Sequence, residues 1–210
     1  MKNTKQQKFW QSNFGREYTE RNNYGPKQLD DFYRRTYGLS RSQMNNDFLV
    51  KLQIGNILEV GCNTGNQLRL MQKHGFDNLH GLELQSYAVR RAKELTQDIN
   101  IIQGSAFDLP FKDNYFDLVF TSGVLIHINP KDLKKVMAEI YRVSKKYIWG
   151  FEYFSEKHQA INYRGNVDYL WKGDFAKMYL KFFPKLKLLK EKKYKYLASD
   201  NLDVMFLLKK

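Results

Sequence analysis

The sequence is short of cysteine and of long apolar runs, and each shortage excludes a class of protein. Its 210 residues contain one cysteine, Cys62, which excludes an internal disulfide and a cysteine-built zinc site and suits a reducing compartment. No run approaches the roughly 20 apolar residues that a membrane span requires. The first 25 residues lack the apolar core of a signal peptide. We therefore expect a cytoplasmic protein without membrane insertion.

Acidic residues are also few relative to basic ones. The sequence has 22 aspartates and glutamates and 35 lysines and arginines, which gives a formal net charge of +13. Such an excess is compatible with nucleic acid, an anionic membrane surface or an acidic small substrate. The densest basic run, residues 181–196, alternates lysines with apolar residues, as on the solvent face of a strand. The net charge therefore does not decide whether the partner is nucleic acid, a membrane surface or an acidic substrate.

Short apolar runs alternate with amphipathic segments from about residue 55, which is typical of a parallel sheet covered by helices. The expected strands are 57–60, 79–84, 99–103, 116–122 and 146–151, and the expected helices are 64–74, 86–96 and 130–143. Residues 186–198 and 203–208 favour a C-terminal antiparallel hairpin. The sequence thus predicts an α/β, Rossmann-like, doubly wound and mostly parallel seven-stranded sheet.

The N-terminal segment differs from this pattern. Residues 1–50 are rich in tyrosine, phenylalanine, asparagine and arginine, and we expect them to form a helical lid on a domain of residues 51–210, the whole making one globular unit. Aromatic residues recur at Phe9, Trp10, Phe14 and Tyr18. This spacing favours a helix packed on the core. In the functional alternative, Tyr18 or Arg21 contacts a cofactor when the lid closes.

The stretch LEVGCNTGNQL, residues 58–68, indicates a buried strand that turns tightly into a helix. In a doubly wound sheet, the turn after the first strand is where a nucleotide binds. Gly61 lets the chain leave the strand sharply, and Gly65 lets the helix N-terminus approach a ligand. Asn63 stands where glycine is common, and asparagine is the residue that best tolerates a left-handed backbone there.

An acidic residue follows at a fitting distance. Glu83 stands at the end of the second expected strand, where a carboxylate can accept hydrogen bonds from both ribose hydroxyls and would repel a 2′-phosphate. The alternative is a solvated glutamate at a strand end. Its register with the glycine turn favours the ribose role.

The order of Glu59, the glycine turn, Glu83, QGSAFDLPF at 103–111 and YFDLVFTSG at 115–123 resembles the class I methyltransferases that use S-adenosylmethionine. The resemblance implies that Gly61, Asn63 and Gly65 line the methionine and ribose, that Leu84 contacts the adenine, and that Ser105 and Ala106 flank its amino edge. Many relatives have aspartate in place of Ser105. The implied cofactor-binding set is Tyr18, Arg21, Glu59, Gly61, Cys62, Asn63, Gly65, Glu83, Leu84, Ser105, Ala106, Ser122 and Gly123, and the product is S-adenosylhomocysteine.

A closer likeness covers nearly the whole chain. The segments FGREYTERN at 14–22, FTSGVLIHINP at 120–130 and YRGNVDYLWKGDFA at 163–176 resemble the methylases associated with pseudaminic acid biosynthesis. That group is tied to surface-glycan gene clusters, and it also has asparagine in the turn. The resemblance implies a small acidic or sugar acceptor, such as a nonulosonic acid or a nucleotide-linked sugar.

Methyl transfer asks for positioning, water exclusion and, for a hydroxyl acceptor, a base. His127 follows the fourth strand and is the first candidate, with a core or capping histidine as the alternative. Glu152, Tyr163 and Arg164 are further candidates near the same crevice. Arg164 suits a bidentate grip on a carboxylate, or it pairs with Asp168 to brace the loop. We expect no metal site and either a monomer or a homodimer.

Three other functions stay open. The basic charge allows an RNA or DNA methyltransferase, although the N/D-P-P-Y/F/W box of exocyclic-amine methylases is absent. A cofactor-binding module without catalysis is possible in principle, but intact Gly61, Gly65 and Glu83 argue against it. An NAD-dependent oxidoreductase would need G-x-G-x-x-G, which Asn63 and Asn66 interrupt.

Overall fold

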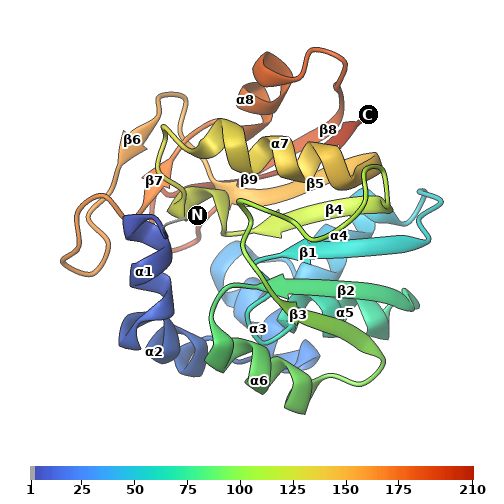
Figure 1. The fold of residues 1–210 in the computed structure, drawn as a ribbon, viewed down its shortest axis with the longest axis horizontal. Coiled ribbons are helices and arrows are strands. Elements are labelled where there is room, and N and C mark those ends of the chain that lie inside the picture. The colour runs from blue at the N-terminus through green and yellow to red at the C-terminus, as the bar shows by residue number, and fades with distance from the viewer. Residues whose placement is uncertain (1–2) are drawn as a thin grey trace.

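The computed structural model describes residues 3–210, which build one central sheet with helices on both faces (Figure 1). The strands are β1 (Asn56–Val60), β2 (Asn78–Glu83), β3 (Ile99–Gln103), β4 (Phe116–Ser122), β5 (Ser144–Tyr153), β6 (Gln159–Ala160), β7 (Trp171–Lys172), β8 (Lys187–Lys195) and β9 (Leu202–Lys209). The helices are α1 (Lys5–Gln11), α2 (Asn13–Arg21), α3 (Pro26–Tyr37), α4 (Arg41–Leu49), α5 (Asn66–Lys73), α6 (Ser86–Leu95), the 3₁₀ turn η1 (Leu125–His127), α7 (Leu133–Val143) and α8 (Phe175–Phe182).

The main sheet has seven strands in the order β3-β2-β1-β4-β5-β9-β8. The chain runs outward from β1 to β2 and β3, then returns to place β4 on the other side of β1, parallel to it. Ligands of doubly wound sheets bind beyond the carboxyl ends of the strands where the order reverses in this way. The predicted fold class is confirmed, and the fold directs attention to the end of β1.

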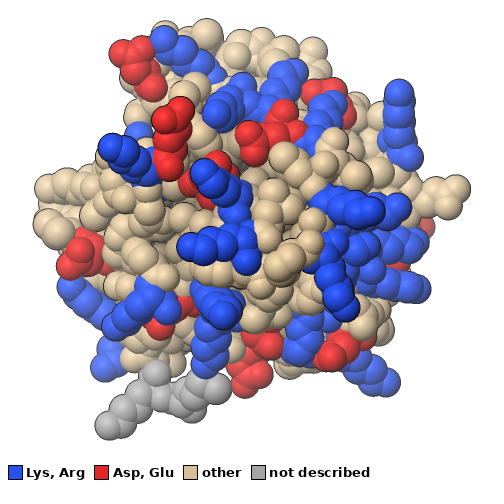
Figure 2. Space-filling view, turned by 90° about the horizontal axis from the view of Figure 1, so that it is seen from above, with Lys and Arg blue, Asp and Glu red and all other residues tan. Residues whose placement is uncertain are grey.

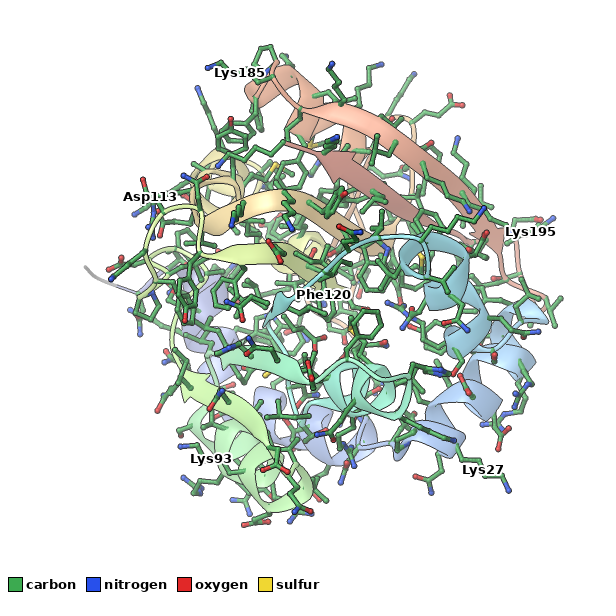
Figure 3. The ribbon with its side chains drawn as sticks, turned by 90° about the vertical axis from the view of Figure 1, so that its right-hand side faces the viewer. Lys27, Lys93, Asp113, Phe120, Lys185 and Lys195 are labelled. Carbon is green, nitrogen blue, oxygen red and sulfur yellow. The ribbon has the colours of Figure 1, made fainter. Side chains whose placement is uncertain are left out.

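Neighbouring residues of each central strand are buried on opposite faces of the sheet. Ile57 packs with the helices α3 to α6, whereas Leu58 packs with α7 and α8, and both are fully buried. Phe120 of β4 points into the first of these two cores (Figure 3). Parallel strands covered on both faces lack polar alternation for this reason.

The N-terminal helices divide between two tasks. Helices α3 and α4 belong to the core, since Met44, Phe48 and Leu49 are buried against the sheet. Arg41 is fully buried there, donating from Nη1 to the Tyr33 hydroxyl at 2.9 Å, with its guanidinium over the Phe151 ring. Helices α1 and α2 instead lie beside the carboxyl ends of the strands (Figure 1). The division of the chain at residue 50 stays a prediction.

The C-terminal hairpin is confirmed, with β9 antiparallel to both β5 and β8. Asp203 of β9 is buried, and its Oδ2 accepts hydrogen bonds from the hydroxyls of Tyr37 and Tyr196. Burial raises the pKa of Asp203 to about 7. The carboxyl group therefore joins α3 to the hairpin at the cost of an unfavourable environment for its charge.

Several local elements differ from the expectation. Helix α5 begins at Asn66 because Gly65, its N-cap, is left-handed with φ 74°. Helix α7 begins at Leu133 because residues 130–132 form a turn. The turn η1, the pair β6 and β7, and helix α8 were not anticipated. Within residues 3–210, no helix combines the length and the apolar character needed to cross a membrane.

Candidate active site

The turn after β1 has the left-handed backbone that its sequence predicts at Asn63. Gly61, Asn63 and Gly65 have φ values of 77°, 47° and 74°, so the left-handed asparagine is confirmed. The amides of Gly61 and Cys62 both donate to Leu82 O, at 2.7 and 3.1 Å, and tie the turn to the end of β2. A Cβ atom on Gly61 would lie 2.6 Å from Val124 Cγ2, so the turn also needs glycine for space.

Two backbone amides, one from this turn and one from the start of α6, hold the Glu83 carboxylate. Its Oε2 accepts from Asn63 N at 2.9 Å and its Oε1 from Gln85 N at 2.8 Å. Each oxygen thus keeps lone pairs for a further donor. Burial raises the pKa of Glu83, while these amide donors lower it. The carboxylate lies in the wall of a cavity, where it can accept a pair of hydroxyl groups.

This cavity, of about 270 Å³, runs past the carboxyl ends of β1, β2, β3 and β4. Of the residues singled out from the sequence, its walls include Tyr18, Glu59, Gly61, Cys62, Asn63, Glu83, Leu84, Ser105, Ala106, Ser122, Gly123 and His127. Gly65, Arg21, Glu152, Tyr163 and Arg164 do not line it. The fold therefore gathers residues from positions 6 to 128 around this cavity, which is called the chamber from here on.

Three buried polar atoms in the wall have no hydrogen-bond partner among residues 3–210: the donor Trp10 Nε1 and the acceptors Glu59 Oε2 and Gln67 Oε1. Glu59 Oε2 and Gln67 Oε1 both belong to side chains less than 10% exposed. Burial raises the pKa of Glu59 well above its ordinary value, and the nearby Arg41 opposes the shift. Unpaired buried acceptors are costly, so this end of the chamber favours a ligand that brings hydrogen-bond donors, such as an ammonium group.

Helices α1 and α2, called the lid from here on, close the chamber through side-chain hydrogen bonds. Thr19 Oγ1 donates to Asn63 Oδ1 at 3.0 Å, and Gln7 Nε2 donates to Ser105 Oγ at 2.8 Å. Gln85 Nε2 donates to the carbonyls of Trp10 and Ser12 at 3.1 and 3.2 Å. These amide and hydroxyl groups were not identified from the sequence, because no spacing along the chain marks them.

His127, at the end of η1, is 8% exposed and lines the chamber. Its Nδ1 lies 2.8 Å from Tyr169 O, so Nδ1 carries the proton and donates to that carbonyl. Burial lowers the pKa of His127 to about 4. The imidazole is therefore neutral at pH 7. Its Nε2 is an acceptor with no hydrogen-bond partner among the described residues.

Aromatic rings surround His127. The ring centroids of Trp10 and Tyr163 lie 4.5 and 5.3 Å from that of His127, and Tyr18 lies 5.1 Å from Trp10. Burial raises the pKa of Tyr18, with the phenol of Tyr163 as the next cause. Although Tyr163 is absent from the chamber wall, it backs His127 from the loop between β6 and β7.

Glu152 does not reach the chamber. It is 1% exposed, and its carboxylate accepts from the backbone amides of Val124, Leu125 and Ile126 at 3.2 to 3.4 Å. These residues lead directly into His127. Burial raises the pKa of Glu152 to about 7, against the lowering by its donors. The geometry gives Glu152 a role in holding η1, and with it His127, in place.

The two arginine candidates are on the surface. Arg21 is exposed and forms an ion pair with Glu17 at 3.5 Å. Arg164 is exposed at the tip of its loop with φ 51°, and no ion pair joins it to Asp168 in the described chain. The alternative pair that would brace the loop is therefore not formed, and the grip on a substrate carboxylate stays a prediction. Among residues 3–210, no cluster of three or more histidine, cysteine or acidic side chains could hold a metal.

Comparisons with known proteins agree with this geometry. Residues 58–147 match a family described as a methyltransferase domain. A segment of 104 residues is 35% identical to 24-methylenesterol C-methyltransferase 2 of Arabidopsis thaliana, covering 46% of this chain and 28% of that protein. The chain thus spans less than a third of this relative's length.

Solved structures share the fold at low identity. An S-adenosylmethionine-dependent methyltransferase from Methanosarcina mazei aligns with a TM-score of 0.60 at 17% identity, over 76% of this chain and 94% of that one. A methyltransferase from Burkholderia thailandensis, solved with 1,6-didemethyltoxoflavin and S-adenosylhomocysteine, aligns with a TM-score of 0.65 at 11% identity, over 80% and 76%.

S-adenosylmethionine fits the chamber observed here. Its ammonium group would satisfy the unpaired Glu59 Oε2, its ribose hydroxyls would meet Glu83, and its base would extend toward Ser105 and Ala106 at the end of β3. The matched methyltransferase domain, the shared fold and this fit agree on S-adenosylmethionine as the cofactor.

Proposed function

We propose that the protein transfers a methyl group from S-adenosylmethionine to a hydroxyl of a small acceptor, with His127 as the base. The observation that carries the proposal is the neutral imidazole in the chamber wall, with Nδ1 fixed by Tyr169 O and Nε2 unpaired. A histidine in a merely structural role normally has both nitrogens satisfied. This one lines the chamber and keeps one acceptor without a partner among residues 3–210.

The cofactor supplies an activated methyl group, so the protein's task is positioning and proton removal. Glu59, Gln67 and Glu83 would hold the cofactor at one end, and the lid would exclude water. His127 Nε2 would accept the hydroxyl proton while the Tyr169 carbonyl holds Nδ1–H. Because burial keeps the pKa of His127 near 4, proton removal should accompany methyl transfer rather than precede it.

The acceptor we favour is a nonulosonic acid or a nucleotide-linked sugar of a surface glycan. Two observations support this class: the likeness of residues 120–130 and 163–176 to methylases of pseudaminic acid biosynthesis, and the aromatic rings around His127. Aromatic faces pack well against the apolar faces of sugar rings. Arg164 would meet the acid group only after its loop moves inward. A cytoplasmic location and a monomeric or homodimeric state remain predictions.

A second candidate is methylation of an alkene carbon in an apolar acceptor. It is favoured by the curated sterol methyltransferase relative and by the same rings, because Trp10, Tyr18 and Tyr163 could stabilise a cationic intermediate. In that reaction the first step needs no base. The two candidates therefore differ in their dependence on His127 and in the acceptors they use.

The test is transfer of a radiolabelled methyl group to parallel acceptors: nonulosonic acids, sugar nucleotides, sterols and RNA. We expect label in the sugars and an about 10²- to 10⁴-fold loss of turnover in His127→Ala. His74→Ala, at an exposed position outside the chamber, is the matched control. Label confined to sterol would support the second candidate. Label confined to RNA, or full activity in His127→Ala, would refute the proposal.

A further inference from the structure

Much of the positive charge lies in one part of the structure. Residues 177–195, from α8 through β8, contain eight lysines, one glutamate and no arginine, a formal +7 of the total +13. Lysine and arginine side chains also outnumber acidic ones over the face seen from above (Figure 2). Lys185, just before β8, and Lys195, at the end of β8, lie at the two ends of this outer strand along one edge of the molecule (Figure 3). We call the segment 177–195 the basic rim.

The basic rim follows the outermost strand of the sheet. Strand β8 pairs with β9 on one side, and no strand of the described chain pairs with its other side. Its side chains reach both faces of the sheet: Lys192 meets Asp47 of α4 at 3.3 Å, whereas Lys193 lies over the Phe154 ring at 3.9 Å. The charges therefore surround an exposed edge rather than one helix face.

The charge of the rim is only partly neutralised. Asp47 pairs with Lys190 and Lys192, and the exposed Asp200 pairs with Lys195. Among residues 3–210, no carboxylate lies within 4.0 Å of the side-chain amino groups of the other rim lysines, which are Lys177, Lys181, Lys185, Lys187 and Lys193. Unpaired lysines in a row attract an extended anion more strongly than a single small one.

Apolar side chains stand among these lysines. Leu188 and Leu189 are 44% and 48% exposed, at a register shift where β8 bulges away from β9. Phe182 and Phe183, just before the strand, are half-buried. Lysines commonly protect a sheet edge against pairing with other chains. That role does not explain two adjacent exposed leucines, which would themselves favour association.

Lysine mixed with aliphatic side chains is typical of surfaces that lie on anionic lipid. Nucleic-acid surfaces use arginine forks and stacked aromatic rings. The rim has no arginine, its two tyrosines are buried, and its two phenylalanines are half-buried. We propose that the basic rim docks the protein on an anionic membrane surface, with Leu188 and Leu189 entering the headgroup region. This docking is independent of the reaction in the chamber.

The experiment is sedimentation of the full chain with phosphatidylcholine vesicles that contain or lack phosphatidylglycerol. We expect binding to the anionic vesicles alone and release at about 1 M salt, where the Debye length is about 3 Å. The triple variant Lys181→Gln, Lys185→Gln, Lys187→Gln should bind about a hundredfold more weakly, since each lysine near such a surface contributes about fivefold. Affinity for S-adenosylhomocysteine should stay unchanged and reports correct folding.

A matched triple variant removes the same charge elsewhere: Lys27→Gln, Lys73→Gln, Lys93→Gln, at exposed positions of α3, α5 and α6. It should bind vesicles nearly as well as the parent protein. Leu188→Ser with Leu189→Ser should weaken binding about tenfold or more without changing its salt dependence. Equal binding of the two triple variants, or no binding to anionic vesicles, would overturn the proposal. Rim-dependent binding to RNA without vesicle binding would assign the rim to nucleic acid instead.

Discussion

Replacing Glu83 should reveal which part of the cofactor it binds. Each oxygen of its carboxylate accepts one backbone amide, from Asn63 or Gln85, so each keeps lone pairs for one ribose hydroxyl. Hydrogen bonds to a charged group contribute about 1.5 to 3 kcal/mol. In Glu83→Ala, water replaces the carboxylate, so we expect affinity for S-adenosylhomocysteine to fall about 10- to 150-fold.

Calorimetry with two ligands separates this contact from a general disturbance of the turn. The second ligand is the 2′,3′-dideoxy analogue of S-adenosylhomocysteine, which lacks both hydroxyls. Glu83→Ala should weaken binding of the parent ligand but barely change that of the analogue, because the analogue never makes the contact. Glu94→Ala, on the exposed face of α6, serves as a control.

Equal weakening of both ligands would mean that Glu83 acts only by shaping the turn through its two amide bonds. The assigned ribose contact would then be wrong. A melting curve of the free variant helps to interpret that outcome, because loss of the turn should also lower stability.

Further predictions concern the turn, the base and the hairpin. Gly61→Ala should abolish measurable cofactor binding, because the new Cβ would lie 2.6 Å from Val124 Cγ2 at a φ of 77°; Val124→Ala should restore part of it in calorimetry, and no restoration would contradict the steric account. Glu152→Gln places an amide donor against backbone amides of η1, so turnover should fall with cofactor affinity nearly unchanged; a loss of affinity equal to the loss of turnover would contradict this. Asp203 has a folded pKa near 7 and an unfolded value of 3.8, so the folded state holds a proton that the unfolded state has lost, and stability falls as pH rises through this window by up to about 4 kcal/mol. Asp203→Asn should remove that slope and be the more stable form at pH 8 in urea unfolding, whereas a pH-independent difference would refute the linkage.

The sequence predicted best what depends on local geometry. Asn63 was expected to be left-handed because few other side chains tolerate that backbone, and its φ of 47° confirms this. The sheet followed from apolar periodicity. The place of Glu83 at the end of β2, facing the glycine turn, followed from its spacing after that turn.

The sequence did not reveal contacts between residues that lie far apart along the chain. Glu152 looked like a residue of the crevice, but three amides from η1 turn its carboxylate inward. Arg41 is fully buried although arginine is normally exposed. Its guanidinium donates to the Tyr33 hydroxyl and lies over the Phe151 ring. Amides such as Gln7 contact the site from about 100 positions away along the chain. None of these partners is visible in local spacing.

In the proposed reaction, the lid would contact both the cofactor and the acceptor. On α1, Gln7 contacts Ser105 at the base end of the chamber, and Trp10 packs against His127 at the acceptor end. A ligand at either end that orders α1 leaves less ordering entropy for the other to lose. Binding of cofactor and acceptor should therefore be cooperative, and by thermodynamic reciprocity an acceptor analogue should tighten S-adenosylhomocysteine by the same factor as the reverse. The helix would then make product release a concerted event, in which loss of one product loosens the hold on the other.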